Sequence, residues 1–178
     1  MKKILLSLFL IFSATVIVHA QVHETKFSIG PEVAVPTYAG ITSNGIGGGV
    51  TLEYFLNKKV AVTGGISFNH FKGEVFNNFK HDTINGFSVM PVLFGAKYFI
   101  IHSFYVSGSA GVIVGLHNAG NHLALSPGVG IEIPVSSKTG VDVGVKLIGV
   151  PTGYSFSENS FLNKGGYSFL TCRLAYIF

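Results

Sequence analysis

The sequence predicts an all-β protein, an eight-stranded antiparallel up-and-down transmembrane β-barrel, preceded by a cleaved signal peptide. Only 11% of the 178 residues are charged, whereas ordinary soluble domains contain about 25%. Beyond the N-terminus, no apolar run approaches the ~18 residues that a membrane helix requires. Segments with a period of two recur instead, and only helices and closed barrels satisfy every backbone group in lipid. A chain of membrane-like composition without such helices is therefore expected to form a barrel.

The first twenty residues have the features of a secretory signal. A pair of lysines precedes an apolar run over residues 4–18, and the small Ala20 stands at the expected cleavage position. The alternative is an N-terminal membrane anchor, for which the run is short of the ~20 residues of a span. The sequence therefore predicts a signal peptide at 1–20 and one barrel domain at 21–178. Cys172 is the only cysteine, so the exported domain has no internal disulfide.

The first four predicted strands are separated by segments rich in turn-forming and polar residues. They cover residues 26–35, 46–55, 60–70 and 86–99. In each strand, apolar side chains occupy alternate positions and polar or small ones the others, as a sheet with two different faces requires. The apolar sides carry, in order, Phe27, Ile29, Val33 and Val35; Val50, Leu52 and Tyr54; Val62, Ile66 and Phe68; and Met90, Val92, Phe94 and Tyr98.

The last four predicted strands repeat this alternation over residues 104–116, 123–135, 141–149 and 166–178. Their apolar sides carry Val106, Ala110, Val112 and Val114; Leu125, Val129, Ile131 and Ile133; Val143, Val145 and Leu147; and Leu170, Cys172, Leu174, Tyr176 and Phe178. We expect these sides to face lipid.

The connections between the predicted strands alternate in length. Long loops at 36–45, 71–85, 117–122 and 150–165 alternate with turns at 56–59, 100–103 and 136–140. Membrane barrels have tight turns on the periplasmic side and longer loops outside. Aromatic residues cluster beside the short turns and at the C-terminus, where a girdle is expected at one membrane interface. They are Tyr54, Phe55, Tyr98, Phe99, Phe104, Tyr105, Tyr176 and Phe178.

Seven charged residues occupy the strand side opposite the apolar one. They are Glu32, Glu53, Lys97, Glu132, Asp142, Lys146 and Arg173. A Lys or Arg that faced the bilayer centre would cost about 2–4 kcal/mol, so we expect these side chains inside the barrel. They would form either a plug of paired ions or the lining of a narrow polar path. The plug is favoured, because eight strands enclose only enough room for side chains.

These features together resemble the small eight-stranded outer-membrane β-barrels of Gram-negative bacteria, the OmpA/OmpX-like, porin-family barrel domains. The resemblance rests on the signal peptide, on Met-Pro-Val-Leu-Phe-Gly-Ala-Lys-Tyr at 90–98, on Gly-Val-Gly-Ile-Glu at 128–132 and on the aromatic C-terminus. It implies an outer-membrane location and contact with outer-membrane lipid. It also implies that Tyr176 and Phe178 form the signal read by the outer-membrane assembly machinery.

The expected function is that of a non-catalytic, monomeric barrel, which supports the envelope or contacts a surface ligand through its outer loops. No catalytic residue, cofactor or metal is predicted. A net charge of +4 without a concentrated basic face gives no indication of nucleic-acid binding. Histidines at 70, 81, 117 and 122 lie at or near the outer loops, but no cysteine or helical spacing supports a metal site.

The sequence leaves two alternatives open. The first is a lipid-modifying enzyme of the lipid A deacylase or acyltransferase type. His122 and Ser126 would be about 13 Å apart on one strand face, too far for a catalytic hydrogen bond. The second is a soluble lipocalin-like carrier, in which the apolar side faces inward and Glu32, Glu53 and Arg173 are exposed to water.

Overall fold

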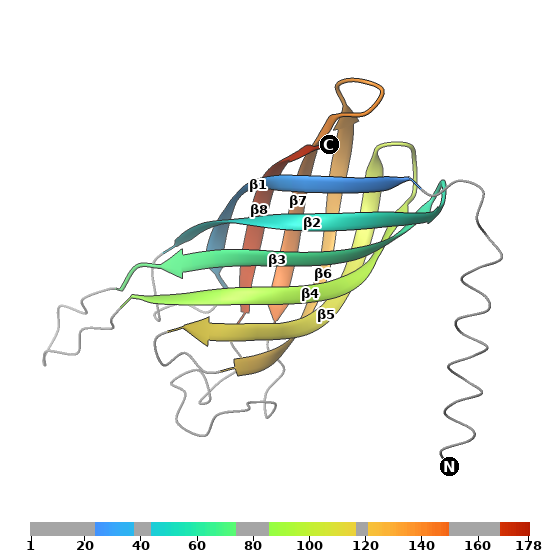
Figure 1. Ribbon diagram of the computed structural model, residues 1–178. Helices are drawn as coiled ribbons and strands as arrows, with labels where there is room; N and C mark the ends of the chain where they lie inside the picture. Colours follow the sequence, from blue (N-terminus) through green and yellow to red (C-terminus); the bar gives the residue numbers. More distant parts are fainter. Residues whose placement is uncertain (1–23, 38–43, 74–85, 117–120, 150–167) are drawn as a thin grey trace, which may run out of the picture.

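The protein is a closed barrel of eight antiparallel strands (Figure 1). This computed structural model describes residues 24–37, 44–73, 86–116, 121–149 and 168–178, so the predicted signal peptide lies outside it. The strands are β1 (Thr25–Pro36), β2 (Gly45–Asn57), β3 (Val60–Phe71), β4 (Phe87–Phe99), β5 (Phe104–Leu116), β6 (Asn121–Pro134), β7 (Gly140–Gly149) and β8 (Ser168–Ile177). Each strand pairs with the next, and β8 closes the barrel on β1 through pairs such as Glu32 with Arg173.

The predicted eight-stranded antiparallel barrel is confirmed, and the predicted strand boundaries agree with the structure to within two residues. The short connections at 58–59, 100–103 and 135–139 lie at one end of the barrel, which we name the turn end (Figure 1). The opposite end, from which the longer connections leave, is the loop end. Within the described ranges, the structure contains no helix of sufficient length and apolarity to cross a membrane.

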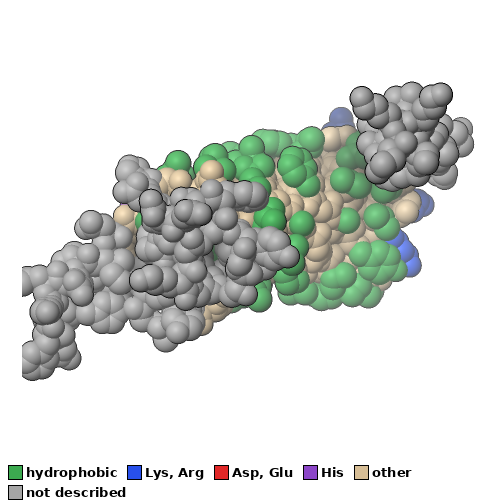
Figure 2. All heavy atoms as spheres, turned by 90° about the horizontal axis from the view of Figure 1, so that it is seen from below, with side chains coloured by type: hydrophobic (Ala, Val, Ile, Leu, Met, Phe, Trp, Pro, Cys, Tyr) green, Lys and Arg blue, Asp and Glu red, His purple; other side chains and the backbone are tan. Residues whose placement is uncertain are grey.

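The outer surface of the barrel is apolar. Figure 2 shows hydrophobic side chains over the strands and Lys or Arg only toward one end of the visible wall. Most of the large exposed side chains come from the alternating positions that the sequence assigns to the lipid side, and they include Phe27, Leu52, Ile66, Phe94 and Leu174. A continuous apolar surface of this extent is unfavourable for a monomer in water, but it is favourable in contact with the hydrocarbon of a membrane.

The inside of the barrel is closed by two apolar layers. The loop-side layer consists of Ala34, Phe71, Phe87, Val89, Ile113, Ala124, Ile148 and Phe169. The ring centroids of Phe71 and Phe87 are 5.1 Å apart, and those of Phe71 and Phe169 are 5.4 Å apart. The turn-side layer consists of Phe55, Ala61, Phe99 and Tyr105. Most polar side chains of the lumen therefore lie between the two layers, and a hollow of about 270 Å³ at the turn end reaches Glu132 beside the second layer.

The turn-side layer corrects the expectation of a single aromatic girdle. Phe55, Phe99 and Tyr105 are buried inside the barrel, while Tyr98 and Tyr176 are exposed on its outer face. The reason is the pleat, because neighbouring residues on a strand point to opposite faces. A pair of adjacent aromatics thus contributes one ring to the girdle and one to the lumen.

Candidate functional site in the barrel interior

The turn-side half of the lumen is organised around one buried lysine. Lys97, from β4, is 2% exposed and its Nζ lies among three carboxylates from three other strands. It is 2.5 Å from Oε1 of Glu53, 3.0 Å from Oε1 of Glu132 and 3.3 Å from Oδ2 of Asp142. A buried ammonium remains charged only when it is paired and hydrogen-bonded in this way. Lys97 therefore ties β2, β6 and β7 to β4 across the lumen.

Two further side chains complete this Lys97 network. The hydroxyl of Tyr105 donates a 2.7 Å hydrogen bond to Oδ1 of Asp142, and the Lys97 ammonium lies 4.1 Å from the centroid of the Tyr105 ring. Lys26, which is partly exposed at the turn end, reaches the second oxygen of Glu132 at 3.1 Å. The carboxylates thus have partners toward both the turn-side layer and the rim.

Glycines on β6 and β7 create the space that the Tyr105 ring fills. A Cβ built at Gly130 would overlap the phenol of Tyr105, and one at Gly144 would be 2.8 Å from the same hydroxyl. The absence of a side chain at Gly130 and Gly144 is therefore what admits the Tyr105 ring into a narrow barrel.

A second polar group lies around Arg173 of β8. Its Nη1 donates to Oγ1 of Thr51 at 2.7 Å, and its Nη2 donates to the hydroxyl and carbonyl oxygens of Ser28 at 3.1 and 3.3 Å. Its Nε is 3.7 Å from Oε1 of Glu32. The other oxygen of this carboxylate, Oε2, accepts a 3.5 Å hydrogen bond from Nδ2 of Asn69. Arg173 therefore fastens β8 to β1, where the barrel closes, and to β2 beyond it.

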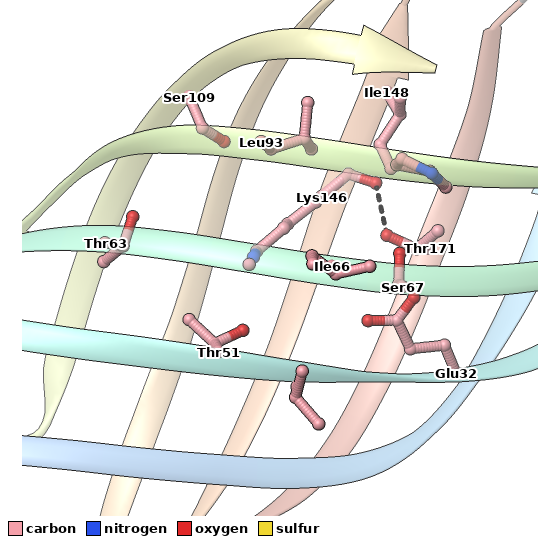
Figure 3. A pocket seen from close by; sticks show the side chains of 13 residues that line it. Glu32, Thr51, Thr63, Ile66, Ser67, Leu93, Ser109, Lys146, Ile148 and Thr171 are labelled. Carbon is pink, nitrogen blue, oxygen red and sulfur yellow. Dashed lines mark hydrogen bonds between the residues drawn. The ribbon is translucent and has the colours of Figure 1, made fainter. Parts of the chain in front are cut away.

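Lys146 lies in a small polar cavity between the Arg173 group and the loop-side layer. The cavity has a volume of about 40 Å³, and Lys146 reaches across it (Figure 3). Thr51 and Thr63 lie on one side, and Glu32, Ser67 and Thr171 lie on the other. This volume exceeds the roughly 10–15 Å³ that a single buried water needs. Hydroxyl groups and water can therefore solvate this ammonium without an open channel.

Charge within the lumen is balanced. The structure buries all four carboxylates, Glu32, Glu53, Glu132 and Asp142, together with Lys97 and Arg173, and half-buries Lys146 in the cavity. Lys26 at the rim supplies a fourth cation, and because it sits at the very start of β1 the strand alternation did not identify it as inward-facing. The lumen consequently carries no net charge when all eight groups are ionised.

His122 departs from the sequence prediction. It was expected in an outer loop but lies on β6, buried and on the inward side together with Ser126. The strand begins at Asn121, earlier than the polar residues at that point suggest. His81 and His117 lie outside the described residues. Among the described residues, no group of three or more His, Cys, Asp or Glu is arranged to hold a metal.

One polar pair on the outer surface was not found from the sequence. Nδ1 of His70 lies 2.9 Å from Oγ of Ser88, on neighbouring strands near the loop end. The two residues are 18 positions apart, and because a long loop separates them, their spacing in the sequence does not indicate that they are in contact. Only the register of β3 against β4, which pairs His70 with Ser88, brings them together.

The placement of charge excludes the lipocalin-like alternative. That reading requires exposed Glu53 and Arg173 and an apolar lumen, but both residues are buried, while Leu52 and Leu174 are more than half exposed. The apolar side faces outward and the charges face the axis, as in a barrel surrounded by lipid.

No family model matches the chain, and no curated protein matches its sequence. Solved structures do share its fold. The attachment invasion locus protein Ail of Yersinia pestis, solved with the heparin analogue sucrose octasulfate, is 16% identical over 89% of this chain and all of its own, with a TM-score of 0.56. Neisserial surface protein A is 10% identical over 88% of this chain and 98% of its own, with a TM-score of 0.61.

A third structure, the outer membrane protein OprG from Pseudomonas aeruginosa, is 11% identical over 89% of this chain and 97% of its own, with a TM-score of 0.53. The apolar exterior of the present barrel agrees with the predicted outer-membrane location. On its topology, its lipid-facing surface and these structural likenesses, the chain has the fold of the OmpA/OmpX-like outer-membrane β-barrels.

Proposed function

We propose that the protein is a non-catalytic outer-membrane barrel with a sealed lumen, which supports the envelope and offers its outer loops for adhesion or ligand contact. The observation that carries this proposal is the order of the side-chain layers along the barrel axis. An apolar layer lies toward each end, and between the two lie the Arg173 group, the Lys146 cavity and most of the Lys97 network, with the Lys26–Glu132 ion pair at the turn-end rim. An ion would have to displace packed rings and break buried ion pairs to cross.

A sealed lumen leaves the surface as the part of the molecule that acts. Buried ion pairs contribute little net stability compared with apolar packing, but they favour one arrangement of strands over others. In this proposal the interior network holds the barrel rigid, and specificity resides in the connections at the loop end. The monomeric state belongs to the same proposal, because the whole outer face is suited to lipid.

The first test is reconstitution. The mature chain in outer-membrane fractions or lipid vesicles is expected to migrate differently on a gel before and after boiling, as a closed barrel does. In planar bilayers it should give no discrete conductance steps. A water-soluble chain, or regular ion conductance through the folded barrel, would contradict the proposal.

The second test addresses the loops. Replacing residues 150–167 with a Gly-Ser linker of equal length should leave the heat-modifiable barrel intact and reduce attachment of expressing cells to host-cell or matrix surfaces. The corresponding control shortens the 135–139 turn at the opposite end. Equal attachment of all three strains would refute a role of this loop in adhesion.

A lipid-modifying enzyme is the second candidate, and the His70–Ser88 pair favours it. The Ser88 hydroxyl and the His70 ring, 2.9 Å apart on the lipid-facing side of the sheet, are the two groups that nucleophilic acyl transfer requires. Among the described residues, however, no carboxylate is hydrogen-bonded to His70, and Ser88 is only 6% exposed. Mass spectrometry of lipid A from cells that express wild type or Ser88→Ala decides between the two candidates, because only an enzyme changes the acyl pattern.

A further inference from the structure

A groove interrupts the apolar outer wall across β1 to β4. Its volume is about 550 Å³, and nearly all of its lining is apolar. The gap arises at Gly48, an outward position without a side chain, whose cross-strand neighbours are Pro31 on β1 and Phe68 on β3. The groove is lined by Ile29, Pro31, Gly48, Val50, Phe68 and Met90, among others. Gly64 is another outward glycine, on β3, but there the ring of Phe94 fills the space, since its Cε1 lies 3.2 Å from where a Cβ of Gly64 would be.

The groove lies in the loop-end half of the barrel. Gly48 is three residues from the start of β2 and nine from its end at the turn side. At about 3.3 Å per residue, the groove is therefore roughly 10 Å below the loop-end rim. If the turn end is periplasmic, as in the proposed function on which this inference rests, the groove faces the outer leaflet of the membrane.

Polar groups lie directly above the groove on the same outer face. His70 follows Phe68 by two residues on β3, and Ser88 precedes Met90 by two on β4. The His70–Ser88 pair is thus about 7 Å closer to the rim than the groove lining. An apolar slot with a hydrogen-bonding pair at its upper end matches a lipid, whose acyl chain is apolar and whose ester or amide linkage accepts hydrogen bonds.

We propose that this groove is a binding site for one acyl chain of lipid A, the outer-leaflet lipid, with the chain's linkage group at the His70–Ser88 pair. His70 is exposed at this position. One ring nitrogen contacts Ser88, and the other is directed to the carbonyl of the bound lipid. The acyl chain enters the groove from the hydrocarbon of the membrane and not from water. The preference for one lipid over another therefore depends on close packing of its acyl chain against the groove wall.

A second hollow offers an internal comparison. It has a volume of about 440 Å³ and surrounds Gly108, another outward glycine, with Phe94 and Pro127 beside it. Gly108 is four residues from the start of β5 at the turn end, so this hollow lies toward the other leaflet. Phe68 and Phe94 are therefore matched residues, each beside one glycine hollow.

The experiment uses the absence of Trp from the chain. Phe68→Trp and Phe94→Trp each introduce one fluorophore into the folded barrel, reconstituted in vesicles of brominated phosphatidylglycerol, which quenches Trp on contact. Unbrominated lipid A is then added. We expect lipid A to relieve the quenching of Trp at position 68 at a mole fraction about threefold lower than it needs at position 94. This corresponds to a modest difference between the association of lipid A with the two hollows.

Variants at the two glycines connect this preference to the groove. In the Phe68→Trp background, Gly48→Leu fills the groove and should abolish the threefold preference, while Gly108→Leu should leave it unchanged. A Cβ at Gly48 would lie 3.2 Å from the backbone oxygen of Gly30, so folding of this variant is checked by heat modifiability. His70→Phe, which leaves the groove lining intact, should also weaken the preference and serves if Gly48→Leu does not fold.

The outcomes separate this inference from the proposed function. Equal relief of quenching at both positions, or an unchanged preference in Gly48→Leu and His70→Phe, would overturn the lipid A site while leaving the outer-membrane barrel in place. Absence of quenching at both positions in a folded barrel would mean that neither position contacts lipid, and the proposal of a membrane barrel would itself fail.

Discussion

The ammonium of Lys97 lies 2.5 Å from Glu53, although the two residues are 44 positions apart and their strands are not neighbours. β3 separates β2 from β4 in the sheet, so the contact crosses the lumen. Glu132 and Asp142 reach the same ammonium from β6 and β7. This lysine therefore compensates three carboxylates in a space that admits little water.

Removal of this charge is expected to be costly. Lys97→Met keeps most of the volume but leaves buried carboxylates without their common partner, which should lower the free energy of unfolding by about 3–5 kcal/mol. Urea titration of the barrel in lipid vesicles measures the change. Lys59→Met, at an exposed turn position, is the control. If adding Glu53→Gln to Lys97→Met restores none of the lost stability, the loss does not arise from the uncompensated charge.

The orientation of the two barrel faces predicts a contrast between arginine substitutions. Leu52 is exposed near the middle of β2, so Leu52→Arg would face the bilayer interior and should destabilise the barrel by about 2–4 kcal/mol. Val135→Arg, in the turn after β6, should cost about 0–1 kcal/mol, since that position lies near an interface. Both are measured by unfolding in vesicles. Equal effects of the two substitutions would mean that Leu52 does not contact hydrocarbon.

The loop-side layer predicts different effects for two phenylalanines of one strand. Phe71 is fully buried and packs against the rings of Phe87 and Phe169, so Phe71→Ala leaves a cavity and should cost about 3–5 kcal/mol. Phe68, three residues earlier, faces outward, and lipid chains can replace its contacts. Phe68→Ala should therefore cost much less. The comparison requires only unfolding curves of the two variants, and a larger effect at Phe68 would place the packed layer on the wrong side of the sheet.

The C-terminal aromatics predict a defect in assembly. The ring of Phe178 lies 4.8 Å from that of Tyr176 and 6.2 Å from that of Phe27, all at the turn end. We propose that Tyr176 and Phe178 form the assembly signal. Phe178→Ala should therefore reduce the amount of heat-modifiable protein in the outer membrane of cells, with refolding into vesicles largely retained. Phe27→Ala, which loses the same ring contact without altering the C-terminus, is the control, and an equal loss in both variants would indicate a packing defect only.

Several features of this protein follow from the amino-acid sequence alone. The period of two along each segment identified the strands, and the opposite phase of charged and apolar residues indicated which side contacts lipid. Both are local properties, because a strand places alternate side chains on opposite faces regardless of its neighbours. The rarity of long apolar runs together with the low charge then required a closed barrel.

The tertiary structure decided which residues meet. Lys97 joins Glu53, Glu132 and Asp142, while Arg173 joins Ser28 and Thr51, and no spacing in the sequence distinguishes these partnerships from others. They depend on the stagger of eight strands around the closed barrel, which sets the height of each side chain in the lumen. The same closure brings His70 beside Ser88 and opens the groove at Gly48, since both depend on strand register. The sequence by itself therefore determined the two faces of the sheet, and only the register of the closed barrel determined the contacts within and upon it.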